Sequence, residues 1–209
     1  MEKHVYFVRH GESDSNKDGI IRGEHAALTD RGKEEADVVA TRLKRIGVTA
    51  LISSPYSRTI ATAQPASGLL QLPIAESDLF VEWRRPSVMV GQSWRSQEFK
   101  ALQDSVIEGY AQDDGFRHSD EENFTDFKKR AEQALEFLVS HPSERIAVIS
   151  HGIFIRALLG VMLFGGSFSG IQFQRLFYHT RVNNTGITYC RYEEGIWRLI
   201  SWNDSAHLG

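Results

Sequence analysis

Three apolar segments, far apart in the chain, are each followed at once by residues that can hold a phosphate group. With their polar continuations, these segments are residues 5–12, 50–58 and 146–152. Short apolar runs that end in turn residues are typical of buried strands. Ligands of an open parallel α/β sheet lie outside the carboxyl ends of its strands. The pattern therefore predicts that Arg9, His10, Arg58 and His151 meet at one edge of a sheet.

The segments between these strands have the periodicity of helices that connect parallel strands. We expect helices at four places: residues 29–47, 57–67, 123–141 and 152–164. Thr29 or Asp30 can cap the first of them, and Gly47 suits its end. An extended stretch is expected over 74–80, a loop over 165–170 and a hairpin over 186–202. This order predicts a three-layer α/β/α fold with a mainly parallel central sheet and an antiparallel edge strand.

Residues 1–209 are interpreted as one domain that carries a helical or irregular insert at about 83–122. The insert contains Trp83, Trp94, Tyr110 and the acidic run 120–122. Long inserted segments often take part in binding. The sequence leaves two interpretations open, a cover over the substrate and irregular surface structure.

Composition excludes several classes of function. The chain has 209 residues with 41% hydrophobic and 24% charged residues, and a net charge of −3 gives no basic field for nucleic acid. The apolar stretch over 153–164 is interrupted by Arg156 and is too short to span a bilayer, so no membrane partner is expected. Cys190 lies in an alternating apolar segment and is interpreted as a core residue. A cytoplasmic location is the default expectation, and a homodimer is one possible assembly.

The motifs, taken in this order, resemble those of the histidine phosphatase superfamily, the phosphoglycerate mutase-like group. The matching residues are Arg9-His10-Gly11-Glu12 with Asn16, Leu28-Thr29 with Gly32, Ser53-Ser54-Pro55 with Arg58, and Ser150-His151-Gly152. The resemblance runs from residue 5 to about residue 190. It implies a phosphoglycerate mutase-like fold and a cofactor-free phosphatase that hydrolyses a small phosphorylated metabolite through a phosphohistidine.

The two arginines and His10 carry the chemistry that a phosphate ester requires. Arginine presents a planar fork of donors that matches phosphate oxygens, so Arg9 and Arg58 are the expected clamps. His10 is the expected nucleophile. Imidazole must be neutral to attack, and the neighbouring arginines disfavour its charged form and so lower its pKa. The carbonyl of Gly11 could fix the ring tautomer by accepting the other ring proton.

Three further roles follow from the resemblance. His151 matches the histidine that stabilises the transferring phosphoryl group, and Asn16 matches an asparagine that can donate to a phosphate oxygen. Glu82 matches the acid that protonates the leaving group, and the charge of a bound phosphate would favour its protonated form. The chain departs from the family after this acid. Many members continue with Gly-x-Trp-x-Gly or Tyr-Gly, whereas here Trp83-Arg84-Arg85-Pro86 follows.

This departure suggests a second anionic subsite. Arg84 and Arg85 follow the predicted acid directly and could join Lys17 and Arg22 from the first loop. Alternatively, both arginines are solvated or pair with the acidic run 120–122. Gly152 is expected to offer its N–H at the start of the helix 152–164.

Other functions remain as alternatives to the phosphatase. A cofactor-dependent phosphoglycerate mutase would share the motifs, but the Tyr-Gly element and a longer insert are not found. A metal protein could use His10, His151 and Glu82, but the chain has no HxxxH or HxH pair, and two arginines would repel the cation. A non-catalytic phosphate-binding module is the third alternative. We therefore expect neither a metal nor a cofactor.

Overall fold

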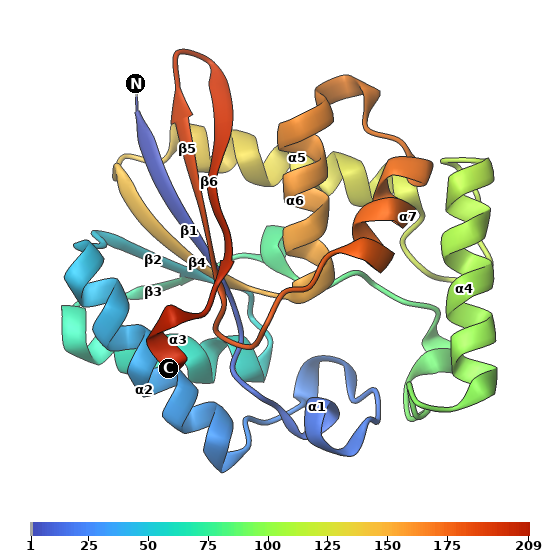
Figure 1. Ribbon diagram of the computed structural model, residues 1–209, viewed down its shortest axis with the longest axis horizontal. Coiled ribbons are helices and arrows are strands. Elements are labelled where there is room, and N and C mark those ends of the chain that lie inside the picture. The colour runs from blue at the N-terminus through green and yellow to red at the C-terminus, as the bar shows by residue number, and fades with distance from the viewer. Residues whose placement is uncertain (1) are drawn as a thin grey trace.

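A six-stranded sheet forms the centre of the computed structural model, which describes residues 2–209 (Figure 1). The strands are β1 (Lys3–Arg9), β2 (Ala50–Ser53), β3 (Ile74–Glu76), β4 (Arg145–Ser150), β5 (Ile187–Glu193) and β6 (Ile196–Asp204). Their order is β3-β2-β4-β1-β5-β6. The first four of these in space run parallel, β5 is antiparallel to β1, and β6 is antiparallel to β5. The predicted mixed sheet is confirmed.

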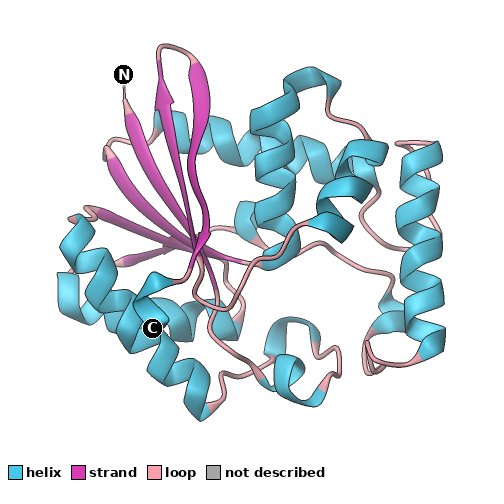
Figure 2. Ribbon diagram, in the orientation of Figure 1, coloured by secondary structure: helices cyan, strands magenta, loops and turns pink. Residues whose placement is uncertain are grey.

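Helices cover both faces of the sheet, as Figure 2 shows. Alternate residues of β1 point to opposite faces, because successive side chains of a strand do so. Tyr6 and Val8 pack with α2 (Asp30–Ile46) and α3 (Ser57–Leu70), whereas Val5 and Phe7 pack with α5 (Phe124–Ser140) and α6 (Gly152–Phe164). These two cores make the layered architecture that the sequence predicts.

Local signals explain where the helices begin and end. The Thr29 hydroxyl accepts a hydrogen bond from the Gly32 N–H and caps α2, which Gly47 ends with φ 77°. Asn123 caps α5 through the Asp126 N–H in the same way. Residue Pro65 lies within α3, which continues to Leu70 and so exceeds the expected helix 57–67.

The observed secondary structure differs most from the expected one in segments that have no long apolar run. The stretch 74–80 holds only the short β3 and then a 3-10 turn, Asp78–Phe80. Two helices were not expected from the sequence, α1 (Asp14–Asp18) and α7 (Gly170–His179). Each helix begins with a capping box. The residues around each box have the composition of a loop, so the sequence does not indicate a helix there. The predicted loop 165–170 is a 3-10 turn that leads directly into α7.

The insert 83–122 is both helical and irregular. Its one α-helix, α4 (Gln97–Gln112), begins at Ser96, whose hydroxyl accepts the Phe99 N–H. Helix α4 packs against α7 (Figure 1). Glu122 is the last residue of the insert. Its backbone carbonyl oxygen accepts hydrogen bonds from the indole N–H of Trp83 and from the hydroxyl of Tyr110. The packing of α4 on α7 thus fastens the insert to the layer that contains α5, α6 and α7, while these two hydrogen bonds hold the insert together.

Two smaller expectations concern the rest of the described chain. Among residues 2–209, we find no helix that has the length and apolarity needed to cross a bilayer. Cys190 lies in the core, and burial raises the pKa of its thiol to about 12. The interpretation of Cys190 as a packing residue is confirmed.

Candidate active site

The three strands predicted to carry site residues are spatial neighbours, in the order β2-β4-β1. Arg9 ends β1, and His10 follows it. Arg58 lies in the first turn of α3 after β2, and His151 precedes α6 after β4. Because Arg9 pairs with Ser150 in the β1–β4 register, the two histidines leave the sheet side by side. Their ring centroids are 5.3 Å apart. The predicted meeting of the four residues is confirmed.

His10 is held as a neutral imidazole with one nitrogen free to react. Its Nδ1 lies 2.7 Å from the Gly11 carbonyl oxygen, and since a carbonyl only accepts, Nδ1 carries the proton. Burial, followed by the charges of Arg58 and Arg9, holds the pKa of His10 well below its usual value. The lone pair is therefore on Nε2.

The loop after His10 is pressed tightly onto the start of α2. A Cβ atom at Gly11 would lie 2.5 Å from the Gly32 carbonyl oxygen, and one at Gly32 would lie 2.0 Å from the Glu12 carbonyl oxygen. The Gly11 N–H donates to the Thr62 hydroxyl at 3.0 Å, and the Glu12 carboxylate accepts from the Thr29 hydroxyl at 2.8 Å. These contacts fix the carbonyl that sets the tautomer of His10.

His151 is fully buried behind the pocket, and both of its ring nitrogens have partners. Its Nδ1 lies 3.0 Å from Nη2 of Arg58 and must accept, because arginine only donates. Its Nε2 lies 2.9 Å from the Ser54 hydroxyl and therefore carries the proton. Burial, with Arg58 as the next cause, holds its pKa well below the usual value. His151 thus orients Arg58, and its direct contact with a phosphoryl group stays a prediction.

Both predicted clamps are charged and held by backbone carbonyls. Arg9 donates from Nη1 to the Val182 carbonyl oxygen at 2.7 Å, and its buried Nε has no partner among the described residues. Arg58 donates from Nη1 to the Gly23 carbonyl oxygen at 2.6 Å. Burial lowers the pKa of each guanidinium to about 10, so each is still protonated at neutral pH.

Asn16 is oriented by Asn184, a residue outside the motifs identified in the sequence. Its Oδ1 accepts from the Ser13 N–H at 3.1 Å and from the Asn184 amide at 3.2 Å. The same Asn184 amide donates to the His10 carbonyl oxygen at 3.0 Å. With its oxygen occupied, Asn16 can offer its NH₂ group to the pocket it lines.

Glu82 lies in the same pocket, at the start of α6. Its Oε1 accepts the backbone N–H of Trp83 at 3.0 Å and of Phe154 at 2.9 Å, and its Oε2 accepts the Ile153 N–H at 3.2 Å. Two of these three N–H groups belong to the first turn of α6, so the end of this helix orients the Glu82 side chain.

A buried ion pair holds the segment that carries Glu82. Arg130 on α5 donates from Nε and Nη2 to the two carboxylate oxygens of Glu122, each at 2.7 Å. Its Nη1 donates to the carbonyl oxygens of Leu79 at 3.1 Å and Val81 at 2.8 Å. Glu122, from the predicted acidic run, accepts the Arg84 backbone N–H at 3.5 Å, but its ion pair is with Arg130 and not with the guanidinium of Arg84 or Arg85.

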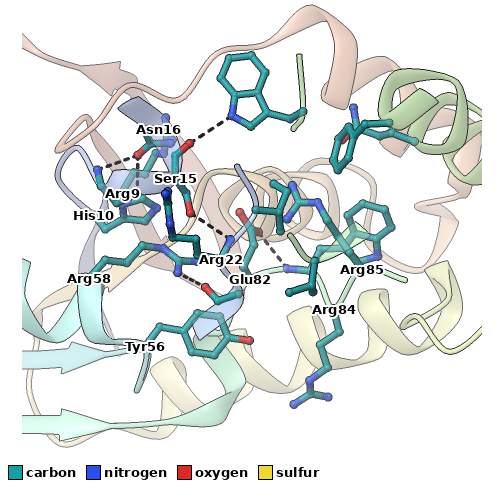
Figure 3. Close-up of a pocket in the computed structure, with 18 of the residues that line it drawn as sticks. Arg9, His10, Ser15, Asn16, Arg22, Tyr56, Arg58, Glu82, Arg84 and Arg85 are labelled. Carbon is teal, nitrogen blue, oxygen red and sulfur yellow. Dashed lines mark hydrogen bonds between the residues drawn. The ribbon is translucent and has the colours of Figure 1, made fainter. Parts of the chain in front are cut away.

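The pocket has a volume of about 610 Å³ and two walls that come from different parts of the chain (Figure 3). One wall holds the residues from the strand ends. The other is formed by the segment from Glu82 to Gln103, including Trp83, Trp94 and Lys100. Part of the insert 83–122 thus lines the pocket. The interpretation of the insert as a cover over the substrate stays a prediction.

The predicted substrate-binding residues are only partly in the pocket. Arg22 and Arg85 line it, and Arg84 lies at its edge, exposed and pointing away from His10 (Figure 3). Lys17 is exposed on α1 and does not line the pocket, because the helix directs it to solvent. Gly152 is buried beside the Arg9 side chain and does not line the pocket either. The structure therefore places Lys17 and Gly152 outside the pocket lining, and a contact of either with a substrate stays a prediction.

A metal centre would require several ligands in one place. Among residues 2–209, no group of three or more His, Cys, Asp or Glu side chains lies close enough to hold an ion.

Together, the fold and the site define an α/β protein with an arginine-lined pocket suited to an oxyanion. A neutral, buried histidine lies in this pocket, at the carboxyl edge of the parallel strands. The model of the histidine phosphatase superfamily (branch 1) matches residues 5–205. The chain belongs to this superfamily and is an enzyme of the histidine phosphatase type.

Among curated proteins, the chain is 28% identical to the probable phosphoglycerate mutase GpmB of Shigella boydii, over 98% of this chain and 94% of that protein. Among solved structures, a phosphoserine phosphatase mutant from Entamoeba histolytica, in complex with phosphoserine, matches with a TM-score of 0.81 and 23% identity, covering 99% of both chains. A mycobacterial glucosyl-3-phosphoglycerate phosphatase matches with a TM-score of 0.78 and 20% identity, over 98% of this chain and 100% of that one. These structures share the fold.

Proposed function

We propose that the protein is a phosphomonoesterase that hydrolyses a small phosphorylated metabolite through a phosphohistidine on His10. The observation that carries the proposal is the state of this residue, a neutral imidazole with Nε2 unprotonated between two charged arginines. A neutral nucleophile beside fixed positive charge suits attack on a phosphate dianion, because the charge offsets the repulsion of the phosphate oxygens.

In the first step, His10 Nε2 forms a bond to phosphorus, and the phosphorus–oxygen bond of the ester breaks. Glu82 gives its proton to the departing alkoxide oxygen. Arg9 and Arg58 hold the phosphoryl oxygens, and Asn16 can donate a further hydrogen bond. His151 holds Arg58 in place.

In the second step, water attacks the phosphohistidine. Glu82, now a carboxylate, takes a proton from that water as the oxygen–phosphorus bond forms, and the phosphorus–nitrogen bond breaks. Inorganic phosphate leaves, and His10 and Glu82 return to their starting states. No metal is assigned a step.

One observation favours a second candidate, a phosphoglycerate mutase, in which the phosphoryl group of the phosphohistidine returns to an organic acceptor. The curated relatives are named as probable phosphoglycerate mutases. The two candidates share the first step and differ only in what accepts the phosphoryl group.

A trapping experiment tests the proposal. The protein is mixed briefly with a ³²P-labelled phosphate ester and quenched in base. We expect a base-stable, acid-labile adduct that forms with chelator present, is blocked by vanadate and does not form in His10→Ala. Full activity of His10→Ala would contradict the proposed nucleophile. A rate that chelator abolishes and a divalent ion restores would contradict the metal-free reaction. Conversion of 3-phosphoglycerate to 2-phosphoglycerate in place of phosphate release would favour the mutase.

A further inference from the structure

The pocket carries far more positive charge than one phosphate group requires. Its lining includes five arginines and one lysine but only one carboxylate, Glu82. Arg9 and Arg58 are assigned to the phosphate by their place beside His10. The charge that remains comes from Arg22, Arg84, Arg85 and Lys100.

Two of these cations have buried nitrogens that no protein group satisfies. Among residues 2–209, four buried side-chain nitrogens lack a hydrogen-bond partner, and three of them line this pocket: Arg9 Nε, Arg22 Nη1 and Arg85 Nε. Buried donors without a partner are costly, so a cluster of them at one pocket indicates an acceptor supplied by a ligand. Arg9 belongs to the phosphate. Arg22 and Arg85 require another acceptor.

Both arginines are positioned before any ligand binds. The Arg22 backbone N–H donates to the Ser15 hydroxyl at 3.2 Å, and its Nη2 is bound to Asp18 at 2.6 Å, which leaves Nη1 toward the pocket. The Arg85 guanidinium lies over the Trp83 ring, 5.3 Å from its centroid. Arg85 makes no ion pair within 4 Å among the described residues, and in Figure 3 it turns back toward the side of the pocket where Glu82 lies.

Arg84 differs from its neighbour in each of these respects. It is exposed, and its side chain points away from the labelled residues (Figure 3). Lys17 is outside the pocket. The subsite for a second anion that the sequence suggests therefore consists of Arg22 and Arg85, with Lys100 of α4 on the same wall as Arg85.

We infer that the substrate is a phosphate ester with a second oxyanion, a carboxylate or another phosphate, which Arg22 and Arg85 bind while the ester phosphate lies beside His10. This inference rests on the proposed function, because it takes the ester phosphate to be the reacting group. Arginine suits either oxyanion, since its fork of donors matches both.

Matched substrate pairs test the inference. 3-Phosphoglycerate and glycerol 3-phosphate differ by a carboxylate, and fructose 1,6-bisphosphate and fructose 6-phosphate differ by a phosphate. We expect kcat/KM to favour the first member of at least one pair by roughly 10- to 100-fold, the range for a charged contact. The pair that shows the preference identifies the oxyanion. The preference should persist at high salt, which screens long-range attraction but not a buried contact.

Three variants assign the preference to residues. Arg85→Gln and Arg22→Gln should each reduce the ratio within the preferred pair by roughly tenfold. Arg84→Gln, which removes the same charge one residue away, should keep the ratio. A ratio that falls for Arg84→Gln and not for the other two would overturn the assignment.

A binding measurement on the unmodified protein tests the subsite even if the variants fail to fold. It also separates the failure of the subsite from the failure of the proposed function. Phosphonoacetate should bind the unmodified protein at least about tenfold more tightly than methylphosphonate. Equal binding and equal kcat/KM within both pairs, with nitrophenyl phosphate still hydrolysed, would overturn the subsite alone. If no phosphate monoester is hydrolysed and no phosphohistidine forms, the proposed function fails, and the phosphonate pair still decides the subsite.

Discussion

His10 and His151 have the same side chain but opposite tautomers, because different groups contact them. The Gly11 carbonyl places the proton of His10 on Nδ1, whereas Arg58 and Ser54 place that of His151 on Nε2. The contact of His10 could be predicted from its own neighbour in the sequence. The contacts of His151 could not, because they depend on α3 and on the exact distance between two strands.

A substitution at Glu82 tests its assignment as the general acid. Glu82→Gln keeps an oxygen that can accept the N–H groups at the start of α6 but cannot supply a proton. We expect hydrolysis of alkyl phosphate esters to slow by about 10²–10⁴-fold. Nitrophenyl phosphate should slow much less, because its leaving group needs no proton. The measurement is kcat for both esters.

Glu76 and Asp78 serve as matched controls for this prediction, because they are carboxylates from the same stretch that lie outside the pocket lining. Their glutamine and asparagine variants should keep the ratio between the two esters. An equal loss with both esters in Glu82→Gln would indicate a structural role for this residue.

At the scale of elements, the start of α6 and the segment 79–82 act as one unit. Glu82 binds the first N–H groups of α6, and Arg130 binds the carbonyls of the segment from the opposite side. Arg130→Met would leave the Glu122 carboxylate buried without its partner. We expect a loss of about 3–5 kcal/mol in the free energy of unfolding, measured by urea denaturation.

The double variant Glu122→Gln with Arg130→Met separates two roles of Arg130, the neutralisation of the Glu122 charge and the positioning of the segment 79–82. Removing both charges should recover much of the lost stability. It should not recover the rate with alkyl esters, because the carbonyls of Leu79 and Val81 still lack their donor. A single variant that costs less than about 1 kcal/mol would show that the ion pair is not a significant support.

The sequence predicts the elements whose apolar residues face the sheet and fails for those that pack elsewhere. The predicted helices α2, α5 and α6 bury regular apolar stripes against strands. Helix α7 instead packs against α4 and α6, so its apolar residues have no strand to match. The side-chain direction of Lys17 depends on α1, a single short helix that was not predicted. Pocket walls formed by such elements are therefore the least predictable part of the site.

At the scale of the whole molecule, the two buried histidines make stability depend on pH. Their pKa values are lowered in the folded state and return to about 6.5 in the unfolded state. Below pH 6.5 the unfolded chain therefore binds more protons, and stability falls as the pH falls. Each histidine contributes up to about 1.4 kcal/mol per pH unit. We expect the pair to cost about 2 kcal/mol between pH 6.5 and 5.5, because each histidine of the unfolded chain is already half protonated at pH 6.5.

Urea denaturation at the two pH values measures this loss. His10→Gln and His151→Gln should each remove about half of the contribution of the pair, whereas a glutamine at the exposed His25 should leave the pH dependence as it is. A pH dependence that is the same in the unmodified protein and in the double histidine variant would contradict the assignment.

The two walls of the pocket come from different parts of the chain, and this separation has a consequence for how such an enzyme can evolve. The wall that would carry out phosphoryl transfer is built into the strand ends and cannot change without disturbing the sheet. The facing wall belongs largely to a segment between β3 and α5 that contributes no strand. Mutations in that segment beyond Glu82 can alter substrate choice while the reaction is preserved, so relatives with one chemistry can diverge in what they accept.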